Sequence, residues 1–392
     1  MMVKRSRGLL AGLAIALASS TAAYAADGQA FAERLKTLLE PQGVVLTYAG
    51  VENSGDDVVI KGAKVATDKE ALDLGDLTFE TVAGTAEQGF TAARLDLQDV
   101  DKTENENRLS IKGMEIEGLQ LAGTAQASDP AMPTSVKFDR AGLDSMTIQQ
   151  NGKDVVTLGT TEMTSTGEGA GGISGTFNVS EFMVDTTADP ESEGSKTMAA
   201  IGYPQVRGSI DGTGAWTPAD GKLTLDPLKI VWQDAGELDF AYTITGYTPA
   251  FIQQLSQLQA QMAANPEASD STGMAVLGLI SQLYLNNARL SFTDNSLTDK
   301  LLEYYAQRNG QTRDELVTNL KASLPPILNY LQNQAFQERV QAAVDAYLDN
   351  PENMTITIAP QTPVPATQVM GAAMGAPQTL PQVLNLEVTS NQ

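Results

Sequence analysis

The densest group of acidic side chains is the first candidate for chemistry. It contains Asp96, Asp99, Asp101, Glu104 and Glu106. Two carboxyl groups at a suitable separation act as the acid and base of a glycosidase, and several carboxylate oxygens together can bind calcium. The group lacks the Asp-x-Asp-x-Asp-Gly order of a calcium loop, and at strand spacing its members line a wet sheet face. We therefore expect solvated side chains and assign no catalytic residue, metal ligand or cofactor.

Histidine and cysteine are both missing from the sequence. Their absence excludes Ser-His-Asp and Cys-His catalytic units, histidine-bearing zinc sites and disulfides. Lys61 and Lys112 each stand between isoleucine and glycine, but outward-pointing lysines commonly protect sheet edges. Ser195 and Lys196 are adjacent and do not form a Ser-x-x-Lys motif. The residue types and motifs therefore favour a non-enzymatic protein, and an enzyme is kept as the alternative.

Apolar side chains at helical spacing form the second candidate site. They occur in two runs: Phe251, Leu255, Leu258 and Met262, then Leu277, Ile280, Leu283 and Tyr284. Such stripes either close a core over a sheet or wall a groove for an acyl chain. The candidate lipid-groove residues are Leu255, Leu258, Leu277 and Leu283.

The elements that would position these residues change type along the chain. Apolar residues at helical spacing predict a short helix over residues 31–39. From residue 44 to about residue 246, apolar and polar residues alternate between Gly-, Asp- and Asn-containing turns, which predicts an antiparallel sheet with one wet face. Gly167–Gly172 and Asp189–Gly194 are predicted to be exposed loops.

The remainder of the chain is predicted to be mainly helical. Thr248-Pro249 suits the start of a helix, and Thr312 with Glu315 fits a capping box. A leucine stripe from Leu316 through Leu320 continues beyond Pro325-Pro326, where the prolines should kink or break the helix. Alternation at residues 354–358 and 383–388 predicts two strands that return to the sheet, and the prolines between them should prevent regular structure.

The N-terminus predicts export. Lys4, Arg5 and Arg7 precede an apolar run, and Ala23-Tyr24-Ala25 supplies a signal-peptidase site, so we expect cleavage after Ala25 and a periplasmic protein. Without the three basic residues of this segment, the net charge of −23 becomes −26. A field of that sign disfavours nucleic acid as a partner. We also expect no transmembrane span in the mature chain.

Two segments resemble known envelope proteins. Gly43-Val44-Val45-Leu46-Thr47-Tyr48, followed by Gly55–Gly62 and a train of amphipathic strands, resembles periplasmic β-rich proteins of the AsmA-like and YdgA-like kind. Ala288–Leu297 with the later Pro360–Pro365 is similar to uncharacterised exported proteins of alphaproteobacteria. The resemblance implies a β-rich envelope protein and assigns no functional residue.

Together these patterns predict an α+β fold with an extended antiparallel sheet, a C-terminal helical subdomain and returning strands. We expect a signal peptide at 1–25, a β-rich domain with a short N-terminal helix at 26–246, a helical subdomain at 247–350 and a Pro-rich tail at 351–392. The leading hypothesis is a non-enzymatic envelope protein that handles lipid or supports the outer envelope, with lipid or envelope proteins as partners. The alternative is a carboxylate-dependent hydrolase of a cell-envelope glycan.

Overall fold

The computed structural model of the protein describes residues 26–66, 71–125, 135–167, 172–264 and 269–392. The predicted signal segment, 1–25, and most of the predicted loop at 167–172 therefore lie outside the described residues. Within them, strands dominate as far as residue 245, and helices alternate with the last strands thereafter. The predicted α+β class, with its antiparallel sheet, C-terminal helices and returning strands, is confirmed.

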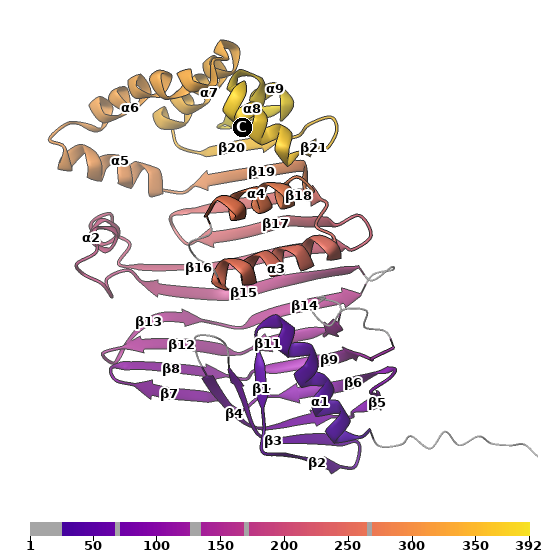
Figure 1. The fold of residues 1–392 in the computed structure, drawn as a ribbon. Helices are drawn as coiled ribbons and strands as arrows, with labels where there is room; N and C mark the ends of the chain where they lie inside the picture. Colours follow the sequence, from indigo (N-terminus) through magenta and orange to yellow (C-terminus); the bar gives the residue numbers. More distant parts are fainter. Residues whose placement is uncertain (1–25, 67–70, 126–134, 168–171, 265–268) are drawn as a thin grey trace, which may run out of the picture.

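The described strands all belong to one antiparallel sheet (Figure 1). They are β1 (Val45–Thr47), β2 (Gly50–Ser54), β3 (Asp57–Ala66), β4 (Ala71–Glu80), β5 (Ala83–Thr85), β6 (Gly89–Asp96), β7 (Val100–Glu104), β8 (Asn107–Lys112), β9 (Glu115–Ala122), β10 (Val136–Lys137), β11 (Arg140–Leu143), β12 (Ser145–Gln150), β13 (Lys153–Leu158), β14 (Thr161–Gly167), β15 (Ile173–Asp185), β16 (Gln205–Thr217), β17 (Lys222–Trp232), β18 (Gly236–Thr245), β19 (Tyr284–Asp294), β20 (Asn353–Ile358), β21 (Val364–Pro365) and β22 (Leu386–Ser390).

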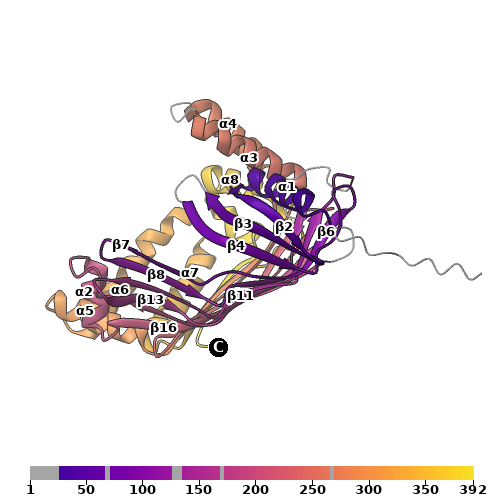
Figure 2. The same ribbon diagram turned by 90° about the horizontal axis from the view of Figure 1, so that it is seen from below.

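The helices lie at the rims and over one face of this sheet. They are α1 (Gly28–Leu39), α2 (Glu193–Ala200), α3 (Pro249–Ala264), α4 (Ser269–Ile280), α5 (Leu297–Arg308), α6 (Arg313–Leu328), α7 (Gln334–Asp349), α8 (Ala366–Gly375) and α9 (Leu380–Val383). Seen along the stack of strands, α1, α3 and α4 stand on the same side of a bent sheet (Figure 2). The fold is therefore a trough whose inner face the helices cover only in part.

The bend arises where long strands change partners. β15 pairs with β14 along its first part and with β13 along its last part, and its register shifts between Val179 and Phe182. β11 and β12 are separated only by Asp144 and also have different partners. β11 pairs with β9 and β14, whereas β12 pairs with β8 and β13. Such irregularities bend a sheet and increase its twist.

A row of directly paired residues crosses the sheet from β3 to β22, and we call it the apolar row. Its members are Val58, Phe79, Leu95, Ile116, Ala141, Met163, Phe177, Gly212, Leu228, Phe240, Leu290, Ile356 and Val388. Residues in register share a face of a sheet. One face therefore carries a line of apolar positions across these strands.

A second row of paired residues lies one position away from the apolar row on each strand. Its side chains point to the opposite face of the sheet and are mostly polar. It contains Thr78, Asp96, Glu115, Glu162, Asn178, Asp211, Lys229, Asp239, Ser291, Thr355 and Thr389. Its side chains bond to one another or to flanking arginines, as in the pairs Asn178–Asp211 at 2.6 Å and Arg289–Asp239 at 2.9 Å. This outer face is stabilised by hydrogen bonds and ion pairs.

The N-terminal end of the apolar row is closed by α1. Asp27 caps this helix by accepting a hydrogen bond from the Ala30 N–H. Phe31, fully buried, meets the rings of Phe79 and Phe90 edge-on, with centroids 4.8 and 5.6 Å away. The predicted helix at 31–39 is thus confirmed, and its apolar stripe builds the main core.

The helix starts predicted at Thr248 and Thr312 are confirmed. Thr248 Oγ1 accepts from the Phe251 N–H, and Thr312 and Glu315 form the reciprocal capping box. Of the kink or break expected at Pro325-Pro326, the break is wrong, because α6 runs on to Leu328, and the kink stays a prediction. The Lys321 carbonyl, which the ring of Pro325 leaves without a helical donor, instead accepts from Gln341 of α7.

Three further expectations differ from the structure. α2 occupies part of the predicted loop 189–194, and α8 forms among the tail prolines, because no proline falls between Ala366 and Ala376. The leucine stripe of α6 is only partly used, since Leu316 is buried whereas Leu320 remains 40% exposed. Among the described residues, no helix is long and apolar enough to cross a membrane.

Candidate functional site

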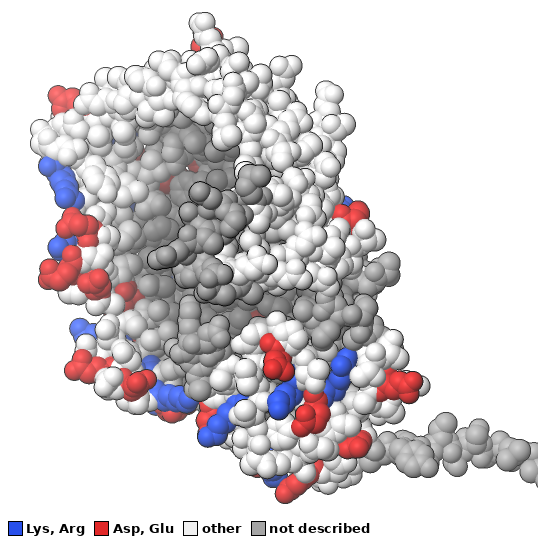
Figure 3. Space-filling model, in the orientation of Figure 1, with Lys and Arg blue, Asp and Glu red and all other residues white. Residues whose placement is uncertain are grey.

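An apolar groove of about 580 Å³ lies on the inner face of the sheet, between β10 and the first turn of α3. Its floor is the middle of the apolar row and the neighbouring positions on the same strands. Lys137 of β10 is the charged residue of its lining, and the large apolar side chains that line it are Phe138, Met163, Ile173, Phe177, Trp216, Leu223, Leu225, Leu228, Tyr242, Tyr247 and Ile252. The space-filling view shows a hollow on this side of the molecule, with charged side chains along its left and lower edges (Figure 3).

The sequence of β16 explains why the floor is hollow. On the inner face this strand presents Ile210, Gly212, Gly214 and Trp216, so two positions in the centre carry no side chain. Gly212 stands in register between Phe177 and Leu228. The gap lets larger neighbours form walls around an open space, which a uniformly packed face would have filled.

The rim of the groove is fixed by the start of α3. Trp216 Nε1 donates a hydrogen bond to the backbone carbonyl oxygen of Tyr247 at 2.8 Å. The Tyr247 ring packs against Phe251, and Ile252 from the next position faces the groove. The indole therefore both lines the cavity and attaches the helix above it to the sheet below it.

The apolar surface extends beyond the groove. Met163, at one end, is 44% exposed, and further along the same row Leu290 and Ile356 are 39% and 37% exposed. Buried cores rarely leave several large apolar side chains of one row open, and exposed apolar patches of this kind mark binding surfaces. The row from Met163 to Ile356 crosses six strand spacings, or about 29 Å at about 4.8 Å each.

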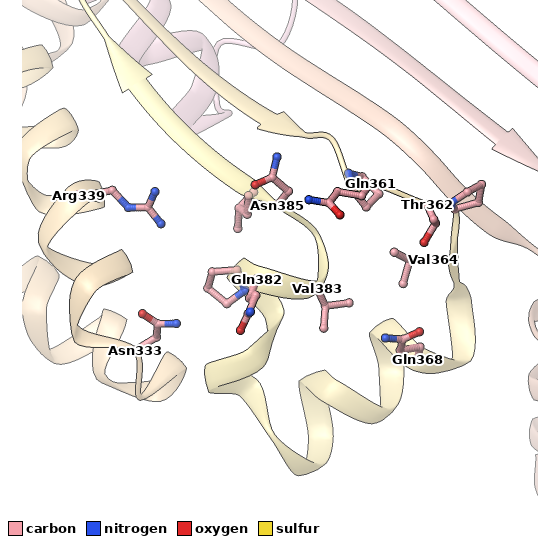
Figure 4. A pocket seen from close by; sticks show the side chains of 13 residues that line it. Asn333, Arg339, Gln361, Thr362, Val364, Gln368, Gln382, Val383 and Asn385 are labelled. Carbon is pink, nitrogen blue, oxygen red and sulfur yellow. The ribbon is translucent and has the colours of Figure 1, made fainter.

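A second, polar pocket of about 570 Å³ lies at the C-terminal end of the trough. It is enclosed by α7, the segment after β20, α8, α9 and the start of β22 (Figure 4). Arg339 extends toward it from α7, while Gln361, Gln382 and Asn385 approach from the tail. We call it the amide pocket.

The four leucines predicted to line a lipid groove occupy the neighbouring helices. Leu258 is buried with Phe251 and Leu279, and Leu255 and Leu283 pack against this cluster. Leu277 is exposed. None of the four is among the residues that line the apolar groove; Leu258 instead lines a hollow of about 320 Å³ between α3 and α4. Their role in lipid binding stays a prediction.

The acidic group at 96–106 is spread over β6, the segment that connects β6 to β7, β7 itself and the turn that follows it. Asp96 pairs with Arg94 at 2.8 Å, and Asp99 accepts a hydrogen bond from the Gly113 N–H. Asp101 pairs with Arg108, whose hydrogen bond lowers the pKa of the Asp101 carboxyl. Three of the five carboxylates therefore form ion pairs or hydrogen bonds that stabilise the local structure. In the described part of the chain, no cluster of three or more potential metal ligands occurs.

The candidate lysines and serine are also on the surface. Lys61 contacts Asp76 at 3.0 Å, and this hydrogen bond raises the pKa of the Lys61 ammonium. Lys112 is exposed at the end of β8. Ser195 and Lys196 lie in α2, and Lys196 bonds to Glu193 and the Glu191 carbonyl.

The groove residues on the sheet were not identified from the sequence. The signal that could have found them is the pattern of β14 to β18, where aromatic and aliphatic residues alternate with polar ones and the inner positions Gly175, Gly212 and Gly214 are glycine. The alternation of apolar and polar residues indicated that one face of the sheet is apolar. It did not show that the helices leave part of that face uncovered.

In a comparison with known protein families, part of the chain matches a family model. Residues 229–391 match a family model described as an uncharacterized protein. The match covers β17 from its Lys229 through β22, and so includes the whole lining of the amide pocket and the last part of the apolar groove. No curated protein matches the chain.

Proposed function

We propose that this protein binds the acyl chain of a lipid in the apolar groove, as an exported, non-enzymatic protein of the cell envelope. The observation that carries the proposal is the partly exposed apolar row, which forms the groove floor and continues to β20. Ligand sites are concave, mostly apolar and about 300–1,000 Å³ in volume. Transfer of a chain from water to this surface is favourable by roughly 25 cal/mol for each Å² covered.

The dimensions support a chain ligand. One leaflet of a bilayer has a hydrocarbon depth of roughly 15 Å, half of the usual 30 Å. The exposed part of the row, at about 29 Å, is long enough to hold such a chain across several strands. The predicted signal peptide supports the proposed location, because an exported protein meets envelope lipid.

The test is the lipid content of protein purified from its native host without detergent. Native mass spectrometry should show adducts of phospholipid or fatty-acid mass. Met163→Glu should remove them, because it places a charge on the groove wall, and should barely change the melting temperature, because Met163 is 44% exposed. Val45→Glu is the matched control: Val45 is 47% exposed and lies outside the groove. Lipid-free wild-type protein, unable to take up added fatty acid, would overturn the proposal.

The alternative, hydrolysis of an envelope glycan by paired carboxylates, has less support. Asp96 and Asp101 are held by arginines and Asp99 by a backbone N–H. Release of sugar from envelope glycan, lost in both Asp99→Asn and Asp101→Asn, would favour the hydrolase over the lipid-binding protein.

A further inference from the structure

The amide pocket is unusual in its charge. Of its thirteen described lining residues, Arg339 alone is charged and five carry side-chain amides, namely Asn333, Gln361, Gln368, Gln382 and Asn385. The whole chain contains 48 acidic and 25 basic residues. The described lining of this pocket has a positive charge, whereas acidic residues outnumber basic ones in the chain as a whole. Such a pocket suits an anionic group.

Arg339 is also unusual among the arginines. Seven of the nine described arginines form ion pairs with Asp or Glu. Of the other two, Arg34 is buried and donates to the Ala122 carbonyl. Arg339 is exposed, with its guanidinium 5.6 Å from the centre of the Phe336 ring and no carboxylate of the described chain within ion-pair distance. Its donors are thus open to a ligand.

The amides divide into two groups. Asn333 and Asn385 fix the walls: Asn333 caps α7 and donates to the Gln378 carbonyl, and Asn385 donates to the Ala359 carbonyl. Gln361, Gln368 and Gln382 form no side-chain hydrogen bond with other described residues, and all three are exposed. An amide both donates and accepts, so these three can bond to phosphate oxygens and to neighbouring hydroxyl groups.

The pocket is joined to the apolar groove through the sheet. Leu386, in the pocket wall, pairs with Ile358, which continues in register through Ala288 and Tyr242 to Leu225 in the groove. Tyr242 already lines the groove, and the three strand spacings from Leu386 to Tyr242 span about 14 Å. A chain of roughly 15 Å that starts at the pocket would therefore reach the groove region.

We propose that the amide pocket binds the phosphate ester of a lipid head group whose acyl chain lies along the apolar row. Arg339 would bind two phosphate oxygens in the bidentate geometry that a guanidinium favours, and the glutamine amides would bond to the remaining head-group atoms. This inference rests on the proposed function and names the class of its ligand: a lipid with an anionic phosphate head.

The test compares two probes that differ only in the phosphate, dilauroyl phosphatidic acid and dilauroylglycerol. Binding to the full chain is followed by tryptophan emission, with calorimetry as a check. We expect the phosphatidic acid to bind about tenfold more tightly, as one charge-assisted pair contributes. Arg339→Gln should abolish this preference and leave the affinity for dilauroylglycerol unchanged. Arg207→Gln, the same change on the outer face, should keep it.

The outcomes separate the two proposals. Equal affinity of the wild-type protein for both probes, or a preference that survives Arg339→Gln, would overturn the head-group site while the acyl groove stands. Failure to bind either probe would overturn the proposed function itself. Inorganic phosphate alone is the third arm: if it binds as tightly as the phosphatidic acid, the pocket is a site for free phosphate and the lipid assignment is wrong.

Discussion

Trp216 donates its indole N–H to the backbone carbonyl oxygen of Tyr247, 2.8 Å away, and thereby connects the groove floor on β16 to the start of α3. The same indole lines the apolar groove. The only other tryptophan, Trp232, packs against Tyr203 and does not line it. The two tryptophans therefore report on different places.

This arrangement makes the groove observable by fluorescence. Trp232→Phe removes an indole whose buried N–H has no partner among the described residues, so no hydrogen bond is lost. In this variant Trp216 becomes the sole reporter, and added fatty acid should shift its emission because the chain displaces water from the groove. In Trp216→Phe, emission should stay unchanged on titration. A response confined to Trp232 would place the ligand elsewhere.

Filling the floor should block the site without unfolding the sheet. A Cβ at position 212 would meet its nearest atom, Leu228 Cδ1, at 3.6 Å, an ordinary contact. Gly212→Val should therefore keep the unfolding free energy within about 1 kcal/mol, since valine also suits a strand, and should lower lipid occupancy several-fold. Ser209→Val, on the outer face of the same strand, is the control for added volume. Equal occupancy in the two variants would show that the ligand does not touch the floor.

The closed end of the trough should dominate stability. Phe31→Ala removes a fully buried ring between Phe79 and Phe90, and the expected loss is about 3–5 kcal/mol, as for other large-to-small core changes. Urea denaturation measures this loss. Val45→Ala, at an exposed position, should cost less than about 0.5 kcal/mol. A small effect of Phe31→Ala would mean that α1 is not part of the folded core.

The ion pairs of the outer face should make the folding stability depend on pH. A hydrogen bond from Arg140, assisted by the charges of Arg140 and Arg94, holds the pKa of the Glu115 carboxyl below its ordinary value. A carboxyl with a lowered folded-state pKa stabilises the protein above its unfolded pKa, about 4.3, and this contribution is lost as the pH falls through the folded value. Glu115→Gln should thus be less stable at pH 7 and lose less stability on acidification.

The control for this pH series is Glu104→Gln, because Glu104 forms no ion pair with described residues and lies at the exposed end of β7. Its melting temperature should follow that of the wild-type protein from pH 7 to pH 3. If Glu115→Gln follows the wild-type curve as closely, the contacts of Glu115 with Arg94 and Arg140 do not contribute to folding.

Much of the local structure was determined by the sequence itself. Alternating residues from position 44 to 246 predicted the antiparallel sheet, Phe31 and its neighbours predicted α1, and Thr312 with Glu315 predicted the start of α6. These signals are local because a strand or helix repeats within a few residues, and a cap bonds only three positions away. The returning strands near 356 and 388 were recognisable for the same reason.

The sites were decided by tertiary structure. The apolar groove depends on which strands are neighbours and on how far α1 and α3 extend over them, and the amide pocket brings Arg339 together with Asn385, 46 positions later. Periodicity shows that a face is apolar but not whether another element covers it, because coverage depends on contacts between distant segments. An arginine likewise looks the same in the sequence whether or not a carboxylate from elsewhere pairs with it. Only the folded chain decides that Arg140 is paired and Arg339 is open.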